Sequence, residues 1–452
     1  MDYRIEYDSM GEVKMQKDAL YGAQTQRSVN NFRIGTENMP TEIIYALAKV
    51  KKACAAVNCR AGKLDEDKKT AISSACDEII SGKHDAHFPL RVWQTGSGTQ
   101  TNMNVNEVIA HIAEKSGPPL HPNDHVNMSQ STNDAFPTAI HVASLCAIEE
   151  KLLPALSSLL ETLDELEKAN SDIIKCGRTH FQDAVPLSFG QEISGWASAL
   201  RESGAMVHTS LGYLRRLPLG GTAVGTGLNA PENFGEDTAS ELSDICGHKF
   251  LTADNKFAAL GSKNALTFTH GALKTLAADL FKIANDIRFL ASGPRCGIGE
   301  ISLPENEPGS SIMPGKVNPT QCEMVTMVAA QVMGNDTSIG FAASQGNLEL
   351  NVFMPLIGYN MMQSLNLLTD AIESFDKNCV RGIKARREKM QAYLESSLMC
   401  VTCLSPIIGY EKAAKTAQTA HKNGSTLREA CLELGYLTAE EFDRYYTPEK
   451  MI

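Results

Sequence analysis

Long runs of apolar residues at helical spacing constrain the fold of this chain more than any other feature of its sequence. Between Leu273 and Leu290, apolar residues recur in the 3–4–3–4–3 order that forms the seam of a helix bundle. Similar runs cover 189–214 and 361–379, and a fourth extends from 136 to 166. The segment 324–333 is apolar on nearly every face, which is typical of a helix at the centre of a bundle. The pattern predicts a mainly α-helical protein with a core of long helices.

The order of these patterns predicts three domains. Alternating patterns typical of strands are scarce and are confined to the first hundred residues. We therefore expect a mixed N-terminal domain at 1–133, a central long-helix bundle domain at 134–393 and a small helical C-terminal domain at 394–452. In the last of these, Asn423-Gly424 is expected to separate two helices.

Charge and composition exclude several classes of function. The chain has 452 residues, of which 42 are basic and 53 acidic, for a net charge of −11. Nucleic acid is not an expected partner, because phosphate binding needs a basic surface. No apolar run reaches membrane-spanning length, and the N-terminus lacks the apolar region of a signal peptide. These features predict a cytoplasmic protein without a membrane partner, in which any anionic ligand is held by a few local cations and backbone donors.

The twelve cysteines predict packing rather than disulfides. Most of them, such as Cys146, Cys322 and Cys431, lie within apolar helical pattern. Cys400 and Cys403 form a single C-x-x-C, which without a second pair is a weak indication of a metal site. We expect reduced cysteines in the core of a cytosolic protein.

Four polar stretches that contain glycine interrupt the apolar pattern. They are "QTGSGTQTNMNVNE" (94–107), "HPNDHVNMSQSTNDAFP" (121–137), "KCGRTHFQDAVP" (175–186) and "PGSSIMPGKVNPTQCEMV" (308–325). Each lies where a long helix is about to start, so capping of the helix accounts for one or two residues per stretch. Capping does not account for the six consecutive polar residues 129–134. Helix N-termini also bind anions, so these stretches together predict a site for a carboxylate.

The length of one helix predicts an oligomer. The pattern from Asp134 to Asn170 extends over roughly 50 Å at 1.5 Å per residue, so the second and third polar stretches lie at opposite ends of one rod. They meet only where helices of different subunits pack side by side. Alternatively, the two stretches serve different sites.

The sequence does not match the known motifs for binding nucleotides or metal ions. The segment "GSSIMPGKV" has five residues between its glycines and Val317 where a phosphate loop needs Ser or Thr. The eleven histidines are scattered without ligand spacing, so a catalytic metal is not expected. His180 is a different case. A loop histidine is usually a solvated side chain, but this one lies in a dense polar run before a buried helix, which makes a functional role equally plausible.

The four stretches together resemble class II fumarase, within the fumarase/aspartase superfamily. The segment "GSSIMPGKVNPTQCE" is similar to the superfamily signature, and the similarity extends from "MGEVKM" near the start to "GYLTAEEFD" near the end. The resemblance implies a homotetramer with a twenty-helix core and active sites formed from three subunits. It also implies reversible anti-addition of water to fumarate to give L-malate, with neither a metal nor an organic cofactor.

Residue by residue, the resemblance implies the following roles. Ser310 resembles the catalytic base on a mobile loop, His180 the histidine on the acid side, and Glu323 the glutamate behind that histidine. A secondary carboxylate site is matched at 121–124, by His121, Asn123 and Asp124. Substrate-binding positions are matched by Ser97, Thr99, Ser131, Thr132, Asn133, Thr179, Ser311, Lys316 and Asn318. Two positions depart from the family pattern: Thr132 stands where serine is expected, and Met128 where lysine is common.

Three alternatives remain. A sister enzyme of the superfamily releases ammonia from aspartate, but it usually has glutamine at the position of His180 and "MPAKVNP" where this chain has "MPGKVNP". Other members of the superfamily are inactive structural proteins, and the retention of Ser310, His180 and Lys316 disfavours that reading. A helical scaffold that binds dicarboxylates without turnover is the third alternative.

Overall fold

The structure, a computed structural model, describes residues 2–115 and 117–452 and divides the chain into two compact units. Unit 1 is made of Met1–Pro154, Ser203–Ala277 and Val328–Thr369, and unit 2 of Ala155–Glu202, Ala278–Met327 and Asp370–Ile452. The units are defined by contacts rather than by order along the chain. The three domains expected from the sequence therefore stay a prediction.

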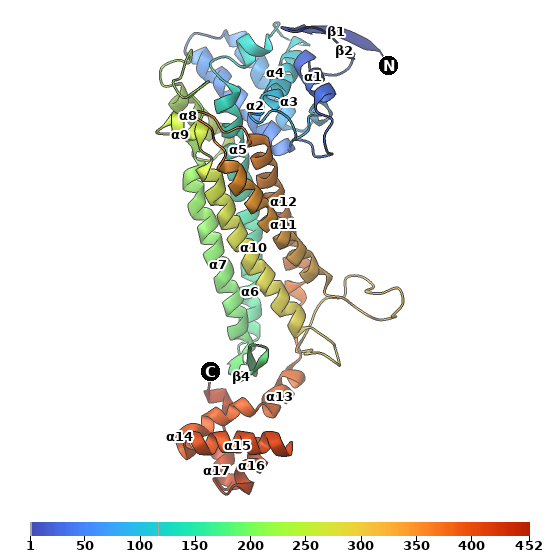
Figure 1. Ribbon diagram of the computed structural model, residues 1–452, viewed down its shortest axis with the longest axis vertical. Coiled ribbons are helices and arrows are strands. Elements are labelled where there is room, and N and C mark those ends of the chain that lie inside the picture. The colour runs from blue at the N-terminus through green and yellow to red at the C-terminus, as the bar shows by residue number, and fades with distance from the viewer. Residues whose placement is uncertain (1, 116) are drawn as a thin grey trace. The chain divides into compact units, whose positions relative to one another are not determined.

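Long helices dominate both units, which confirms the mainly α fold (Figure 1). The residues of five helices are divided between the two units; these helices are α6 (Leu153–Ala169), α7 (Phe189–Leu214), α10 (Asn264–Leu290), α11 (Thr320–Ala343) and α12 (Met354–Asn378). The predicted apolar seams lie on them, and their side chains are buried, as at Leu273 and Leu276 on α10 and Leu365 on α12. The 3–4 spacing therefore predicted both the helices and the faces that they bury.

Unit 1 is organised around α2 (Thr41–Arg60). This helix packs against α3 (Glu66–Ile80), α4 (Thr99–Glu114), α5 (Thr132–Ala147) and α8 (Phe234–Cys246). Alanine, valine and isoleucine fill the contact faces of α2, and its residues from Ile43 to Val57 are mostly buried. The further elements of unit 1 are β1 (Tyr3–Asp8), β2 (Gly11–Gln16), α1 (Ala23–Asn31), η1 (Asp85–His87), η2 (Pro122–Val126), η3 (Ile148–Leu152), β5 (Arg216–Leu217), β6 (Leu251–Thr252) and α9 (Lys256–Gly261).

One buried carboxylate fixes the start of α1 in unit 1. Glu107, on α4, accepts hydrogen bonds from the backbone N–H groups of Gly22 (2.8 Å) and Gln24 (3.0 Å) and from the Thr25 hydroxyl (2.6 Å). The two N–H groups are among the backbone donors that the start of a helix leaves without an intrahelical partner. Burial raises the pKa of Glu107, and the same hydrogen bonds oppose that rise.

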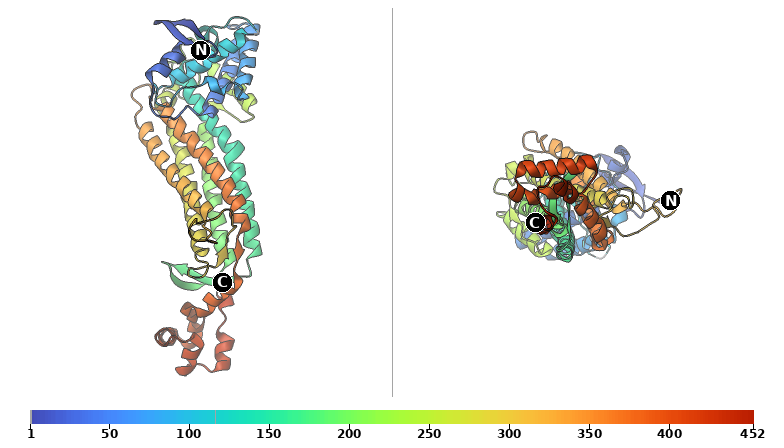
Figure 2. Two further views of the ribbon diagram at one scale, coloured as in Figure 1. Left: turned by 90° about the vertical axis from the view of Figure 1, so that its right-hand side faces the viewer. Right: turned by 90° about the horizontal axis from the view of Figure 1, so that it is seen from below.

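Unit 2 combines the end of α6 (Leu153–Ala169), a hairpin and a group of short C-terminal helices. The hairpin consists of β3 (Ile174–Thr179) and β4 (Gln182–Ser188), drawn as green arrows in Figure 2, and it packs against α13 and η5. As predicted, a break at Gly424 separates two C-terminal helices, and Gly424 takes a positive φ of 62°. The remaining elements are β7 (Ile301–Ser302), η4 (Val380–Gly382), β8 (Lys384–Ala385), α13 (Arg387–Ser396), η5 (Leu398–Leu404), α14 (Ser405–Ile408), α15 (Tyr410–Asn423), α16 (Leu427–Glu433), α17 (Ala439–Tyr445) and η6 (Pro448–Lys450).

The expectation that strands are confined to the first hundred residues is wrong. The β3–β4 hairpin lies at 174–188, in a stretch interpreted from the sequence as a polar loop. Its pattern is weak because the register shifts between Cys176 and Gly177, which breaks the alternation of buried and exposed residues. Its turn, His180-Phe181, also lacks the asparagine and glycine that usually mark a hairpin.

Helix α11 is less enclosed than its sequence predicts. Its residues Val325, Ala329 and Val332 are buried, but Met327 and Phe341 are each 67% exposed. Exposed apolar side chains also lie on α7 (Met206, 48%) and α10 (Phe268, 49%). Within one chain, α11 is therefore covered on one side only. None of the helices described in the structure is both long enough and apolar enough to cross a membrane.

Candidate active site

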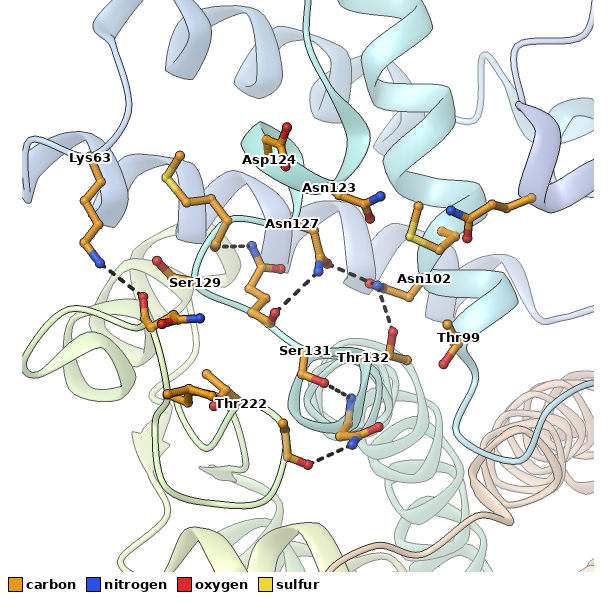
Figure 3. A pocket seen from close by; sticks show the side chains of 18 residues that line it. Lys63, Thr99, Asn102, Asn123, Asp124, Asn127, Ser129, Ser131, Thr132 and Thr222 are labelled. Atoms are coloured by element: carbon orange, nitrogen blue, oxygen red, sulfur yellow. Dashed lines mark hydrogen bonds between the residues drawn. The ribbon is translucent and has the colours of Figure 1, made fainter. Parts of the chain in front are cut away.

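A polar cavity of about 890 Å³ lies in unit 1, where α4 and α5 begin (Figure 3). Its lining is rich in hydroxyl and amide side chains, and Lys63 and Asp124 are the only charged residues among those that the structure places there. From the candidate residues it gathers Thr99, Ser131, Thr132 and Asn133, which the sequence places in two different polar stretches. The lining is completed by Gln24, Asn102, Met103, Asn123, Asn127, Met128, Ser129, Gln130, Thr222, Ala223, Leu228 and Asn229.

Two helix N-termini face this cavity, because Thr99 is the first residue of α4 and Thr132 is the first residue of α5. Ser131 caps α5, accepting a hydrogen bond from the Asn133 N–H (3.2 Å). The first N–H groups of a helix lack intrahelical partners and carry a partial positive charge. Such a cavity can bind a carboxylate with neutral donors.

Ser97 lies next to this site, and its hydroxyl is 2.8 Å from the Thr99 hydroxyl. The backbone between them takes a left-handed conformation at Gly98, with φ of 77° and ψ of 17°. A Cβ atom at Gly98 would lie 2.6 Å from the ring of Phe136. Glycine is therefore required here on both counts, because the backbone is strained for other residues and the ring leaves no space.

A buried aspartate ties the start of α5 to the loop at 220–222. Asp134 accepts hydrogen bonds from the N–H groups of Ser131 (2.9 Å), Gly220 (3.0 Å) and Thr222 (2.8 Å). Burial raises the pKa of Asp134, whereas these three hydrogen bonds favour its ionised form. In the sequence, Asp134 is only the last of the six consecutive polar residues at 129–134. In the structure, the Asp134 carboxylate also positions the loop that carries Thr222 and Ala223, which form one wall of the cavity.

A buried lysine, which sequence analysis missed, supports the floor of the cavity. Lys51 on α2 donates to the side-chain oxygens of Asn127 (2.8 Å) and Gln130 (2.9 Å). The Asn127 oxygen also accepts from Asn102 (3.1 Å), which in turn donates to the Thr132 hydroxyl (3.0 Å; Figure 3). Burial lowers the pKa of Lys51 to about 8.

The only indication of Lys51 in the sequence is its position on α2. It lies four residues after Leu47 and three before Cys54, both of which are fully buried, so it falls on the apolar face of the helix.

The predicted secondary site at 121–124 is partly connected with the polar cavity. Asn123 and Asp124 line the cavity, and His121 does not. His121 caps the start of η2, and its Nδ1 lies 3.1 Å from an oxygen of the Asp124 carboxylate. All three residues are exposed. A role for them in binding a second carboxylate stays a prediction.

In unit 2, His180 occupies the turn of the β3–β4 hairpin. Thr179 pairs with Gln182, so His180 and Phe181 form a two-residue turn with φ of 57° and 58°. Positive φ at both positions is what a type I′ turn requires, and for a histidine followed by a phenylalanine it is strained. Thr179 and His180 are both exposed, and they reach the solvent at the tip of the hairpin.

A buried ion-pair cluster holds this hairpin in place. Glu300 is fully buried and accepts two hydrogen bonds from Arg178, each of 3.0 Å, and its carboxylate is 3.1 Å from the ammonium group of Lys175. The planar two-point pairing of Arg178 fixes the strand that ends at His180. His180 and Arg178 also line a cavity of about 540 Å³ in unit 2.

The loop at 308–318 in unit 2 is closed by its own hydrogen bonds. The Gly309 N–H donates to the Lys316 carbonyl (2.9 Å), and the Asn318 amide donates to the Gly309 carbonyl (2.7 Å). The Ser310 hydroxyl oxygen accepts from the N–H groups of Ile312 (3.3 Å) and Met313 (3.0 Å). The ammonium group of Lys316 donates to the Asn318 side chain.

The remaining predicted residues lie in the same region of the sequence. Ser311 is exposed next to Ser310 in the loop, and Glu323 is exposed in the first turn of α11. Among the described residues of unit 2, no hydrogen bond joins Glu323 to His180. The structure thus gathers four of the predicted substrate-binding residues in one cavity of unit 1, with Ser97 beside it. The others lie on the loop, on the hairpin and at the start of α11.

Comparisons with known proteins identify the family to which this chain belongs. Residues 11–334 match a family model described as "Lyase", and residues 400–452 match one described as "Fumarase C C-terminus". The chain is 58% identical to a class II fumarate hydratase of Helicobacter pylori, over 100% of this chain and 99% of the relative. It is 57% identical to a class II fumarate hydratase of Bacillus subtilis, with the same coverage.

Solved structures show the same similarity. The crystal structure of a recombinant class II fumarase from Schistosoma mansoni matches with a TM-score of 0.97 and 44% sequence identity, covering 100% of this chain and 99% of that chain. Similarity of this extent includes both units and all four polar stretches.

Replacing Lys51 tests the support of the cavity floor. Because its pKa is about 8 in the folded protein and near 10.5 when exposed, the unfolded chain binds more protons between these values, so Lys51 makes stability rise with pH over this range. We expect the difference in Tm between the unaltered protein and Lys51→Met to grow from about pH 8 to about pH 10. Scanning calorimetry measures the Tm of each protein at each pH. Ionisable groups that both proteins share contribute equally to both Tm values, so their effect cancels in the difference.

Lys52→Met is the matched control, because Lys52 pairs with Asp77 at the surface and has no part in the cavity floor. Its difference in Tm should change little over the same range. A Lys51→Met difference that stays constant or shrinks above pH 8 would show that Lys51 is not a buried titrating amine.

Proposed function

Because this chain belongs to the class II fumarate hydratase family, we propose that it adds water reversibly to fumarate to give L-malate, by anti-addition. It is a carbon–oxygen lyase of the hydro-lyase type. The observation that carries the proposal is the match at 57–58% identity over the whole chain. The polar cavity of unit 1 supports it, because two helix N-termini and several hydroxyl and amide groups suit a dicarboxylate.

The difficult step, in the direction from malate, is removal of a weakly acidic proton from carbon. We propose that the Ser310 alkoxide takes this proton from the carbon next to a carboxylate. The electron pair of the C–H bond then moves into that carboxylate, which acquires a second negative charge. The N–H groups of Ile312 and Met313, which donate to the Ser310 oxygen, support the role of Ser310 because they favour the ionised form of the hydroxyl.

The developing charge requires cationic and preorganised donors. Lys316 and Asn318 are the proposed partners of the doubly charged carboxylate, and stabilisation of this kind is usually the largest contribution to the rate. Ser97, Thr99, Ser131, Thr132, Asn133, Thr179 and Ser311 are the proposed binding groups for the rest of the substrate. All of these side chains are neutral, which is consistent with a substrate that brings its own two negative charges.

Loss of the hydroxyl group completes the reaction. As the carbon–carbon double bond forms and the C–O bond breaks, the leaving oxygen takes a proton from the His180 imidazolium, directly or through water, and departs as water. Imidazole is a common general acid near neutral pH. Glu323 is proposed to orient His180. No metal or organic cofactor has a part in these steps.

We further propose that the protein works as a homotetramer whose active sites draw on three subunits. Exposed apolar side chains on the long helices support an oligomer: Met206, Phe268 and Phe341 belong to unit 1, and Met327 belongs to unit 2. Large exposed apolar surface on helices usually marks an interface. His180 and Glu323 are both exposed in one chain, so a partner subunit can bring such groups together.

The substrate is tested by following absorbance of the fumarate double bond with malate and with aspartate as separate substrates. We expect rapid formation of fumarate from malate and none from aspartate. Formation from aspartate alone would identify the ammonia-releasing sister enzyme. Tight binding of both dicarboxylates without product would favour the inactive scaffold.

The base is tested by Ser310→Ala. We expect turnover to fall by about 10²–10⁴-fold, the usual contribution of a general base. Binding of a dicarboxylate inhibitor should stay within a few-fold, because Ser310 acts on the proton rather than on the carboxylates. Ser311→Ala is the matched control, with an expected loss in affinity rather than in turnover. A Ser310→Ala enzyme with near-normal turnover would rule out this role.

Sharing of sites between subunits is tested by co-expressing Ser310→Ala and His180→Asn chains that carry different affinity tags. If each site takes Ser310 and His180 from different subunits, random mixing restores both in about one quarter of the sites of purified hybrids. Each variant alone should be almost inactive. Hybrids as inactive as either parent would show that both residues come from the same chain.

A further inference from the structure

Four potential metal ligands come together in unit 1, away from the proposed reaction. Cys146 and Glu150 lie one helical turn apart, where α5 continues into η3, and Cys246 and His248 lie at the end of α8 and just beyond it. The ligand atoms of Cys146, Glu150 and His248 all lie within 4.8 Å of one another. The Cys246 thiol lies next to the Cys146 thiol, close enough to interact with it. These four residues are called the thiol–imidazole cluster below.

The donor atoms of the cluster indicate which ion fits. Two sulfur atoms, one imidazole nitrogen and one carboxylate oxygen are the ligands that Zn²⁺ takes in tetrahedral sites. Zinc bonds of about 2.0–2.3 Å place neighbouring ligand atoms about 3.3–3.8 Å apart. The ligand atoms of Cys146, Glu150 and His248, all within 4.8 Å of one another, are close to that spacing. Hard ions such as Mg²⁺ and Ca²⁺ prefer sites built from oxygen alone.

The surroundings of His248 resemble those of a metal-binding histidine. Its Nε2 is 3.0 Å from a Glu150 oxygen, and its Nδ1 is 3.3 Å from an oxygen of Glu149. Arg215 holds the other Glu149 oxygen at 2.7 Å. With Nε2 on an ion, the Nδ1–H group donates to Glu149, and such a carboxylate behind a ligand histidine is the usual arrangement in metal sites.

Charge and access also favour a cation. Two thiolates and one carboxylate carry three negative charges, so a divalent ion leaves one, which Lys49 can balance. A cavity of about 130 Å³ lined by Lys49, Cys146 and Glu150 opens beside the cluster.

The helix geometry provides a further indication. Residues Ile148–Leu152 form a π-helical segment between α5 and α6, and Glu149 and Glu150 lie in it. Such segments are rare and occur frequently at functional sites. None of the four cluster residues belongs to the proposed active site, so the segment has no explanation in the reaction.

We propose that Cys146, Glu150, Cys246 and His248 bind one Zn²⁺ ion per chain, which joins the end of α8 to the junction of α5 and η3. The ion is structural. All four protein ligands are supplied by one chain, which leaves no open position for substrate. The zinc site does not depend on the proposed hydratase reaction, and it shares no residue with the proposed active site. It replaces the expectation that Cys146 only packs in the core.

Zinc binding is tested on the assembled enzyme, treated with a thiol reductant and a chelator and then freed of the chelator. Isothermal titration with Zn²⁺ should give one tight site per chain. Cys246→Ser and His248→Gln should each abolish it. Glu149→Gln removes only the group behind His248, so it should keep the site and weaken it by about 10–100-fold. A partial loss of zinc affinity in Glu149→Gln and a complete loss in the other two variants would distinguish a specific four-ligand site from thiols that bind metal nonspecifically.

Cys59→Ser is the matched control, because the Cys59 thiol also lies beside a carboxylate, that of Glu66 at 3.1 Å, but belongs to no such cluster. It should bind zinc like the unaltered enzyme. Zinc should raise the Tm of the unaltered enzyme and of Cys59→Ser, and not that of His248→Gln. Fumarase activity and circular dichroism check that each variant is folded.

Two results would overturn the proposal. One is absence of a one-per-chain site in the reduced, unaltered enzyme. The other is equal zinc affinity in the unaltered enzyme, Glu149→Gln and His248→Gln. If Cys246→Ser does not fold, His248→Gln and Glu149→Gln decide the question by themselves.

Discussion

Buried carboxylates hold the polar loops of this protein against the ends of its helices. Asp134 binds three backbone N–H groups at the start of α5, and Glu107 binds those at the start of α1. Glu300 binds Arg178 and Lys175 below the hairpin. Each loop is rich in residues that favour turns and would be mobile alone. A buried charge left without its partners costs several kcal/mol, so these loops are confined to one conformation.

This confinement allows the protein to divide the chemical tasks. The cavity in unit 1 offers mostly neutral donors in fixed positions, and Lys51 orients two of the amides beneath it. The groups proposed to change their protonation or to meet new charge lie on other segments, the loop at 308–318 and the hairpin. In the proposed mechanism, binding a dianion and stabilising its additional charge therefore belong to different segments. Assembly of several chains is a natural means of uniting them.

Sequence analysis predicted the framework better than the details of the site. The seams on α7, α10 and α12 were found because each buried face repeats over seven turns or so, which makes the pattern strong. The hairpin at 174–188 was missed because its register shift and its His180-Phe181 turn hide the alternation. Lys51 was missed because one lysine among apolar neighbours gives no pattern. Its role depends on Asn127 and Gln130, which are more than seventy residues away along the chain.

By itself, the sequence determined the class of fold and the family. These follow from local periodicity and from motifs in which neighbouring residues act together. Only the tertiary structure decided that Ser131 and Thr99 line one cavity, that His180 is held in a strained turn, and that Cys146 lies beside His248. Such contacts join residues far apart in the chain. They depend on how the buried faces pack, which no single stretch of sequence specifies.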